Sequence, residues 1–435
     1  MKHWFKDQHF RSLLKNSGYL AVSRVIAAVA SVATMSLAAH ALGVLLLGAL
    51  ILITSYAKAV SGIAKFQSWQ LVVRYGGRVI HGEVEDFKTS TGFAFALDVV
   101  SGIGGMLVAV AILPFIATWV GIDKSQLWLA MLYCTLLPTM GAATPTGVLR
   151  ALDRFDLISW QSTASPIARL ILVTIAYFAH ASFAGFVAAW YFTDLAGDLY
   201  GWFLGWRELK RRDLLQGIRP TLRPDSLPGA WRFAIHVNLN ASVQAVWGPI
   251  ARLVVGGLLG AAGAALFRVA SNLADSAGKP ADLLAKAFYP EVARMDLSTR
   301  KPWRLMLRGT VFASALAVVS ILVLLLAGKP ILSFLFGKAF LGAYTPLLIL
   351  MVVPVISVFS FPLPPMLYAL DRPDAPVTAR ILGSVVFFVS IAPLSWKLGV
   401  NGAAIAFVLG NITTAVVMVF QLLREYRRVR GANPA

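Results

Sequence analysis

Residues 17–60 read SGYLAVSRVIAAVASVATMSLAAHALGVLLLGALILITSYAKAV. This stretch contains only two charged residues, Arg24 and Lys58, and its two long apolar runs meet at Leu42-Gly43. A helix needs about 20 apolar residues to cross the hydrocarbon core of a bilayer. Each run is long enough, so the stretch predicts two consecutive membrane-spanning helices joined by a turn.

The same length criterion, applied to the rest of the chain, predicts twelve spans. They are residues 17–41, 44–71, 90–119, 126–149, 160–180, 184–206, 231–258, 262–289, 305–327, 341–369, 378–396 and 400–423. The chain is 58% hydrophobic and 14% charged, whereas soluble domains have roughly 45–50% apolar and about 25% charged residues. We therefore expect an all-α integral membrane protein.

The composition also excludes several classes of site. The lone Cys134 leaves no disulfide framework and no cysteine metal site, and the six histidines show no metal-ligand spacing. A net charge of +19 alone suggests nucleic acid, but these cations lie between apolar spans, as the orientation rule of membrane proteins requires. We expect no cofactor, no metal and no nucleic-acid partner.

The N-terminal segment resembles a secretory signal in part, because a basic arm precedes an apolar stretch. However, residues 19–42 exceed the roughly 7–15 residues of a signal core, and Arg24 interrupts them. We expect a retained first helix.

Lysine and arginine predict the orientation of the spans. If the N-terminus lies in the cytoplasm, the cytoplasmic segments hold twenty-six of the 39 cations. The opposite side then holds four, namely Lys124, Lys329, Lys338 and Lys397. This asymmetry predicts a multi-pass membrane protein with both termini in the cytoplasm.

Short matches between the two halves of the chain indicate a duplication. Residues 151–156 (ALDRFD) match 369–374 (ALDRPD) at an offset of 218, and Leu42-Gly43 matches Leu259-Gly260 at an offset of 217. Each half then holds six spans in the same orientation. We predict two parallel six-helix lobes, residues 1–210 and 231–435, around a central cavity, with a basic linker at 211–230. Such repeats usually enclose a substrate path and work by rocking.

Charged groups within the predicted spans are candidates for lining that path, because they are costly in the bilayer. The eighth span carries a polar stripe at helical spacing. The stripe consists of Arg268, Asn272, Asp275, Lys279, Asp282 and Lys286. We expect this helix to present the stripe to a polar cavity. Arg169 is a further cation within a predicted span.

The repeat offset pairs opposite charges. Lys58 corresponds to Asp275 and Lys65 to Asp282, each at an offset of 217. We hypothesise that these pairs approach each other in one state of a rocking cycle. An alternative is that Asp275 with Lys279, and Asp282 with Lys286, form ion pairs within one helix. Both interpretations can hold together.

Three further carboxylates, Asp98, Asp194 and Asp198, are candidates for ion coupling. Asp194 and Asp198 lie one turn apart on the sixth span, and two neighbouring carboxylates perturb each other's titration. The alternative is a paired structural role. The glycines at 197, 201 and 205 are typical of close helix packing.

Several segments resemble one family across the whole chain. They are residues 15–20 (KNSGYL), 151–155 (ALDRF), 266–270 (LFRVA), 336–344 (FGKAFLGAY) and 398–404 (LGVNGAA). In aggregate they resemble the polysaccharide-transporter branch of the multidrug/oligosaccharidyl-lipid/polysaccharide exporter (MOP) superfamily, the Wzx-type flippases of O-antigen and exopolysaccharide.

The resemblance implies movement of an undecaprenyl-diphosphate-linked oligosaccharide from the cytoplasmic to the periplasmic leaflet by alternating access. It also implies that a polysaccharide polymerase and chain-length proteins are partners, besides membrane lipids. A diphosphate needs cations to replace its hydration. The candidate ligands are Arg24, Lys58, Lys65, Arg252 and Arg268.

Two other functions compete with a flippase. A cation-coupled drug or metabolite antiporter of the same superfamily would need an acidic cavity, but the first span offers Arg24 and no carboxylate. A membrane glycosyltransferase or polymerase would need catalytic acids or a sizeable domain outside the membrane. The predicted loops are too short for such a domain, and the duplicated Asp153 and Asp371 favour a structural role, so we expect a transporter and not an enzyme.

Overall fold

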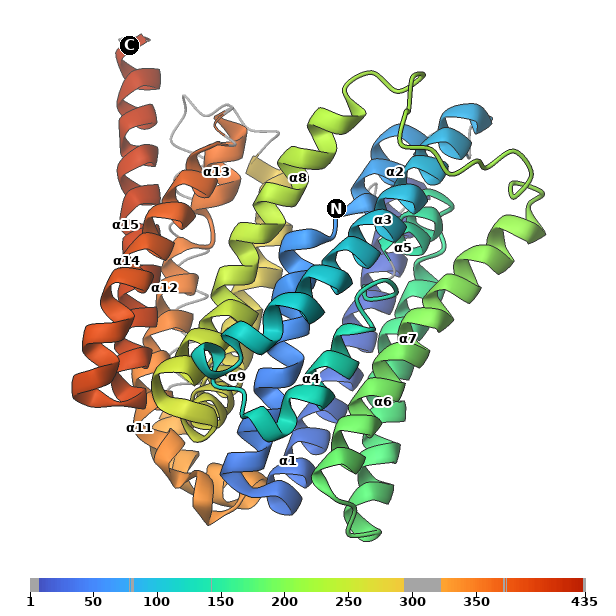
Figure 1. Cartoon of the computed structure of the whole chain (residues 1–435). Helices are drawn as coiled ribbons and strands as arrows, with labels where there is room; N and C mark the ends of the chain where they lie inside the picture. Colours follow the sequence, from blue (N-terminus) through green and yellow to red (C-terminus); the bar gives the residue numbers. More distant parts are fainter. Residues whose placement is uncertain are drawn as a thin grey trace. The chain divides into compact units, whose positions relative to one another are not determined.

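The computed structural model describes residues 8–77, 79, 82–141, 143–292, 322–370, 372 and 374–432. Side chains are described from residue 25 onward, with those of 277–292 among the omissions. Within these ranges the chain is helical and contains no strand (Figure 1). An all-α fold suits a bilayer, because a helix satisfies every backbone amide inside the protein.

The first half of the chain makes six passes. The helix α1 (Gln8–Ala64) is broken at Gly43 and so provides two of them, the second being extended by α2 (Ser68–Gly76). The helix α3 (Val84–Ile116) follows. The short helices α4 (Leu127–Cys134) and α5 (Ala143–Ala151) together make the fourth pass. The half ends with α6 (Phe155–Phe178) and α7 (Phe183–Arg211).

The second half repeats this order. The helix α8 (Ala230–Ala245) continues through a π-helical turn, η5 (Val246–Ile250), into α9 (Ala251–Val292), which is broken at Gly260. After the helix 322–336 comes a pass made of η6 (Lys338–Ala343), α11 (Tyr344–Leu350), α12 (Val352–Ser360) and α13 (Leu363–Ala369). The helices α14 (Asp374–Leu398) and α15 (Val400–Ala432) complete it.

These helices carry the predicted spans. Six of the described helices are long and apolar enough to cross a membrane by length and composition. The first of them, Val25–Gly76, covers residues 25–41 of the first predicted span and all of the second, on the two sides of Gly43. Of the ninth predicted span, only residues 322–327 lie in the described part. The expectation of an all-α membrane protein is confirmed.

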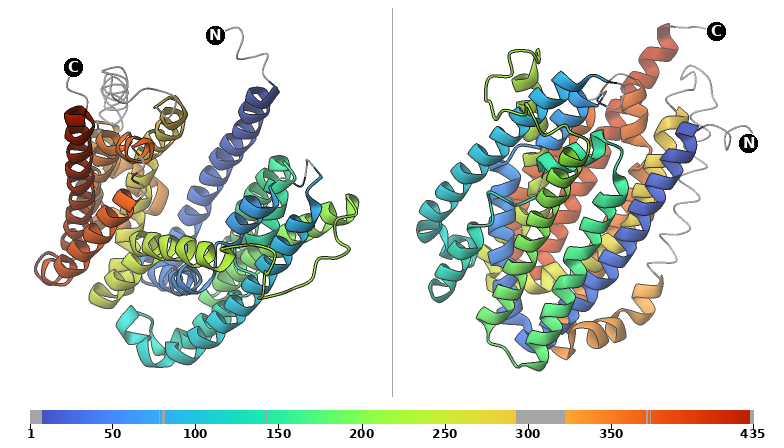
Figure 2. Two further views of the ribbon diagram at one scale, coloured as in Figure 1. Left: turned by 90° about the horizontal axis from the view of Figure 1, so that it is seen from above. Right: turned by 90° about the vertical axis from the view of Figure 1, so that its right-hand side faces the viewer.

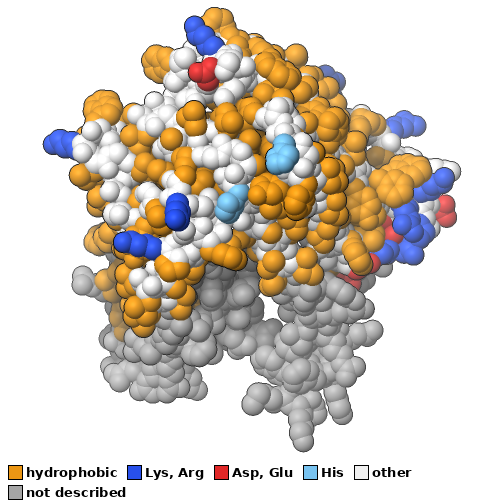
Figure 3. Space-filling view, turned by 90° about the horizontal axis from the view of Figure 1, so that it is seen from below, with side chains coloured by type: hydrophobic (Ala, Val, Ile, Leu, Met, Phe, Trp, Pro, Cys, Tyr) orange, Lys and Arg blue, Asp and Glu red, His pale blue; other side chains and the backbone are white. Residues whose placement is uncertain are grey.

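The chain divides into two compact units, which we describe separately. Unit 1 consists of Met1–Gly43, Ile53–Thr118 and Ile122–Ile250, and unit 2 of Val44–Leu52, Trp119–Gly121 and Ala251–Ala435. Neighbouring helices pack in antiparallel pairs within each unit, α6 along α7 and α14 along α15 (Figures 1 and 2). Hydrophobic side chains cover much of the surface in Figure 3. Several Lys and Arg gather with Asp and Glu at its right-hand edge, and the other cations in this view are scattered.

Two short segments from the first half of the chain belong to unit 2 because small residues let backbones meet. A Cβ built on Gly48 would stand 1.8 Å from the carbonyl oxygen of Ala261. A Cβ on Gly257 would stand 1.9 Å from that of Trp119. No larger residue fits at either glycine without moving the backbone, so these contacts depend on glycine.

The segment predicted as a linker is folded onto unit 1. Leu214 and Ile218 pack against the buried cluster around Phe87, and Leu227 joins the buried cluster around Phe93. The phenol of Tyr75 donates a hydrogen bond to the carbonyl oxygen of Pro228 (3.1 Å). The beginning of α8 is thereby fixed on unit 1, since Ala230 and Ala234 lie in the same cluster as Leu227.

The predicted duplication is visible in the backbone. Gly43 has φ 65° and ψ −175°, and Gly260 has φ 70° and ψ −177°. This region of φ/ψ space is essentially accessible to glycine alone. The two matched Leu-Gly pairs therefore make the same reversal between consecutive passes.

The duplicated ALDR segments each build an ion cluster. In the first ion cluster (Arg154, Asp156 and Glu208), the guanidinium of Arg154 donates to both Asp156 oxygens (2.9 and 2.8 Å) and to Glu208 (2.7 Å). The hydrogen bond from Arg154 lowers the pKa of Asp156. The pKa of Arg154 is raised in turn, chiefly by Asp156.

The second ion cluster (Arg372, Asp374 and Glu425) has the same form. Arg372 donates to both oxygens of Asp374 (3.1 and 3.0 Å) and pairs with Glu425. Glu425 lies 217 residues after Glu208, so the whole cluster is duplicated. Asp153 precedes the first cluster with φ 57°, whereas Asp371 lies outside the described residues.

Candidate functional site

Two helical passes of unit 1 are interrupted, and the interruptions face each other. The second pass loses its helical backbone at residues 65–67, between α1 and α2. The fourth pass runs through turns from residue 135 to 141, between α4 and α5. Backbone that leaves the helix at membrane depth persists only where protein groups satisfy it or where it lines a cavity. Broken helices of this kind often mark binding sites in transporters.

Lys65 joins the two interruptions. Its side chain is 4% exposed, and its ammonium donates to the carbonyl oxygens of Met140 (2.6 Å) and Pro138 (3.3 Å). From α7, the carboxylate of Asp198 accepts a hydrogen bond from the amide of Gly141 (3.1 Å). An ammonium and a carboxylate thus replace hydrogen bonds that a continuous helix would have made.

Asp98, on α3, fixes the helices that resume after the interruptions. It is 0% exposed and accepts from the hydroxyl of Ser68 (2.5 Å), the first residue of α2. It also accepts from the amide and hydroxyl of Thr144 (2.9 and 2.7 Å), in the first turn of α5. A carboxylate at two helix N-termini is favourable because the helix dipole places positive charge there.

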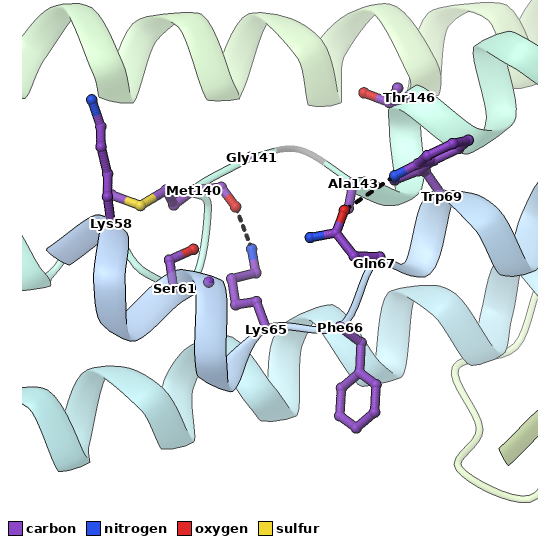
Figure 4. Close-up of a pocket in the computed structure, with 11 residues that line it drawn as sticks. Lys58, Ser61, Lys65, Phe66, Gln67, Trp69, Met140, Gly141, Ala143 and Thr146 are labelled. Atoms are coloured by element: carbon purple, nitrogen blue, oxygen red, sulfur yellow. Dashed lines mark hydrogen bonds between the residues drawn. The ribbon is translucent and has the colours of Figure 1, made fainter. Parts of the chain in front are cut away.

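A pocket of about 380 Å³ lies between the two interruptions (Figure 4). Its size is within the range of small-ligand sites, which starts near 300 Å³. The lining residues are Lys58, Ser61, Gly62, Lys65, Phe66, Gln67, Trp69, Met140, Gly141, Ala143 and Thr146. This lining includes two ammonium groups and no carboxylate, so it is suited to a ligand that is rich in oxygen acceptors.

One end of the pocket is built around an aromatic ring. The indole N–H of Trp69 donates to the side-chain oxygen of Gln67 (3.2 Å). The guanidinium carbon of Arg150 lies 4.0 Å from the centroid of the Trp69 ring. Next to Arg150 on α5, a Cβ on Gly147 would approach the Trp69 Cα to 2.8 Å. Trp69 is therefore held both at its ring, by Gln67 and Arg150, and at its backbone, by Gly147.

The predicted phosphate ligands fall into separate groups. Lys58 and Lys65 line the same pocket, where Lys58 is exposed. Arg252 and Arg268 lie in unit 2 and interact electrostatically with each other and with Asp275. The side chain of Arg24 lies outside the described residues.

The predicted gating pairs stay predictions. Asp275 is exposed on unit 2, and Lys58 belongs to unit 1. The side chains of Lys279, Asp282 and Lys286 lie outside the described residues, although α9 continues through all three positions. The two intrahelical pairs of the alternative interpretation therefore also stay predictions.

The other two candidate coupling carboxylates have different surroundings. Asp194 forms an ion pair with Arg169 and accepts a hydrogen bond from the phenol of Tyr133. Asp198 lies beside the pocket, within electrostatic reach of Lys65 and Lys58. Asp98 and Asp194 thus hold helices together, whereas Asp198 is near the two ammonium groups. Coupling to an ion by any of the three stays a prediction.

The sequence did not reveal the neutral end of the pocket. Gln67 and Trp69 gave no signal because Lys65-Phe66-Gln67 contains neither glycine nor proline, which are the usual marks of a broken helix. Pro138 and Gly141 are such marks for the fourth pass.

Comparison with known proteins identifies the family. A family model described as "Polysaccharide biosynthesis protein" matches residues 78–345. Inner membrane protein YghQ of Escherichia coli K12 is 39% identical over 347 residues, which are 79% of this chain and 98% of that protein. The chain belongs to the polysaccharide biosynthesis protein family.

Solved structures show which fold this family member has. A multidrug resistance MATE transporter of the MOP superfamily, in an inward-facing conformation, aligns with a TM-score of 0.72 at 17% identity, over 95% of this chain and 96% of its own. The lipid II flippase MurJ, in an inward closed conformation, aligns with a TM-score of 0.73 at 11% identity, over 94% and 89%. The family member thus has the twelve-helix fold of these transporters. The resemblance to the polysaccharide branch of the MOP superfamily is confirmed.

Proposed function

We propose that the protein flips an undecaprenyl-diphosphate-linked oligosaccharide from the cytoplasmic to the periplasmic leaflet of the bacterial inner membrane. It would do so by alternating access, with both termini in the cytoplasm, during synthesis of O-antigen or exopolysaccharide. The observation that carries the proposal is the pocket of unit 1, whose lining combines Lys58 and Lys65 with no carboxylate. Family membership supports a role in polysaccharide biosynthesis.

The chemistry of the pocket favours an anionic ligand. Phosphate oxygens accept strong, short hydrogen bonds from ammonium groups, because both partners are charged. Lys65 already donates to two carbonyl oxygens. It therefore attracts an anionic ligand mainly through its positive charge and less through new hydrogen bonds. Lys58 is exposed at the pocket and is the better candidate for direct contact with the diphosphate.

A cation-coupled drug or metabolite antiporter of the same fold is the alternative. A cationic drug would need carboxylates facing it, as opposite charges compensate the loss of hydration. Asp98 and Asp194 instead accept hydrogen bonds or ion pairs from neighbouring helices. Asp198, which lies beside the pocket, accepts the amide of Gly141 and faces the two ammonium groups. The lining of the pocket therefore favours the flippase.

Deletion of the gene tests the proposal. We expect loss of a surface glycan and accumulation of undecaprenyl-linked intermediates in the cytoplasmic leaflet. Normal glycan together with altered tolerance to drugs would contradict the flippase and support the antiporter.

Complementation then tests the pocket. The variant Lys58→Ala should fail to restore the glycan, whereas Lys58→Arg should restore it in part because the positive charge remains. The matched control is Lys88→Ala on α3, since Lys88 lies outside the pocket and pairs with Glu85 (3.6 Å). Equal restoration of the glycan by Lys58→Ala and Lys88→Ala would show that Lys58 does not contact the substrate.

A further inference from the structure

The pocket of unit 1 has two chemically different ends. Lys58 supplies positive charge at one end, and Lys65 lies between Lys58 and Gln67 (Figure 4). The other end is lined by the uncharged side chains of Gln67 and Trp69, and we call it the neutral end. A diphosphate bears all its charge in one place, but the sugar next to it is neutral and carries hydroxyl and amide oxygens. The diphosphate accounts for the two ammonium groups of the pocket but not for the uncharged side chains of the neutral end.

The orientation of the Gln67 amide is fixed by its neighbour. The side-chain oxygen of Gln67 accepts the indole N–H of Trp69 (3.2 Å). Because the oxygen is used in this way, the amide nitrogen points to the opposite side, toward the side where Lys65 lies (Figure 4). An amide with its oxygen occupied offers N–H donors to whatever fills the pocket.

The surroundings of Trp69 hold this arrangement in place. The guanidinium of Arg150 stacks on the indole at 4.0 Å, and a stacked cation restrains an aromatic ring. The packing of Gly147 against the Trp69 backbone restrains it further. Gln67 itself sits in the interruption between α1 and α2, with φ −82° and ψ 58°. The donor is therefore presented by a rigid support.

We propose that the neutral end is the subsite for the sugar that is attached to the diphosphate. The Gln67 amide donates a hydrogen bond to a hydroxyl or acetamido oxygen of that sugar and selects for it. Trp69 and Arg150 are positioning residues, because they orient the Gln67 amide. This inference rests on the proposed function and assigns the part of the ligand that the pocket distinguishes.

Binding of two ligands by the purified full-length protein separates the sugar subsite from the diphosphate site. The probes are undecaprenyl diphosphate without sugar and undecaprenyl-diphosphate-N-acetylglucosamine, each titrated in the same detergent micelles. We expect wild type to bind the sugar-bearing probe more tightly. Gln67→Ala should weaken binding of that probe by about fivefold to tenfold, as expected for one hydrogen bond. It should change binding of the bare diphosphate by less than about twofold.

Two further variants make the result specific. Trp69→Phe keeps an aromatic ring but removes the indole N–H, so it should weaken only the sugar-bearing probe, and by less than Gln67→Ala does. Lys58→Ala should weaken both probes by about tenfold or more, because a charged hydrogen bond to phosphate is stronger than a neutral one.

The outcomes can be told apart. Equal loss for both probes in Gln67→Ala, or no loss for either, would overturn the sugar subsite while leaving the proposed function intact. Failure of the wild-type protein to bind either probe would overturn the proposed function itself. Thermal unfolding of each variant in the same micelles shows that a loss of affinity does not come from unfolding.

Discussion

The two halves of the chain share one kind of ion cluster, built around Arg154 in the first half and Arg372 in the second. The residues in and around the pocket of the first half are not repeated in the second. The residues that stand 217 positions after Lys65, Gln67 and Asp98 are Asp282, Leu284 and Ala315. The duplicated features are a glycine reversal between the first two passes of each half and an ion cluster where later passes end. The comparison indicates that repetition was kept where it maintains the fold, and that the ligand chemistry arose where the halves differ.

The largest effect is expected at a position of the first half that has no counterpart. Asp98→Ala would leave the hydroxyl of Ser68 and the amide and hydroxyl of Thr144 without their acceptor. We expect a loss of about 3 kcal/mol in the free energy of unfolding, measured by thermal unfolding in detergent. The control is Asp86→Ala on the same helix, whose side chain is exposed and should matter little. Equal losses would contradict the bridging role of Asp98.

The two glycine reversals should respond alike. Gly43→Ala and Gly260→Ala place a Cβ in a backbone region that disfavours it, which costs about 1–3 kcal/mol. Neither Cβ would meet another atom within 4 Å, so the cost measures the backbone alone. Gly104→Ala, which is also free of contacts but helical, should stabilise by about 0.5–1 kcal/mol. If the two variants lost different amounts of unfolding free energy, the reversals at Gly43 and Gly260 would not be equivalent.

The two ion clusters should differ slightly. Glu208 accepts from Arg154, Arg211 and Arg212, whereas Glu425 pairs with Arg372 and, at 3.7 Å, with Arg428. We expect Glu208→Gln to lower the free energy of unfolding by about 1–2 kcal/mol and Glu425→Gln to lower it by less. A larger loss at Glu425 would show that the second ion cluster is the more important of the two.

The smallest effect concerns pH. The hydrogen bond from Arg154 lowers the pKa of Asp156, so the folded protein binds this proton less readily than the unfolded chain does. The stabilisation is complete above the unfolded pKa of about 4 and is lost as the pH falls through the lower, folded pKa. The difference in melting temperature between wild type and Arg154→Gln should therefore narrow from pH 7 toward pH 3. If the difference in melting temperature were the same at every pH, Arg154 would stabilise the protein through packing and not through its charge.

Most of the fold could be predicted because each pass has its own apolar run. The reversal at Gly43 and the repeat were also visible, since Leu-Gly and ALDR recur at nearly one offset. Glu208 was missed because it lies outside the matched segments, and its partner Arg154 is 54 residues away. A contact between distant passes leaves no local pattern in the sequence.

The site was predicted in part for a similar reason. Lys58 and Lys65 were found because charge within an apolar run is conspicuous. Gln67 and Trp69 were missed because neutral polar and aromatic residues are common near the ends of spans. Their role depends on the interruption at residues 65–67. Tertiary hydrogen bonds from Lys65 to Met140 and from Ser68 to Asp98 stabilise this interruption.

The bond from Lys65 to the fourth pass has a consequence for biogenesis. Ribosomes deliver the second pass well before the fourth, so the ammonium of Lys65 enters the membrane before the carbonyl oxygens of Pro138 and Met140 exist there. Until then, a charged residue in the bilayer has to be tolerated by the insertion machinery or by water. Insertion of the fourth pass supplies the carbonyl oxygens and relieves that cost. The second pass of the first half is therefore fully stabilised only after the fourth has been inserted.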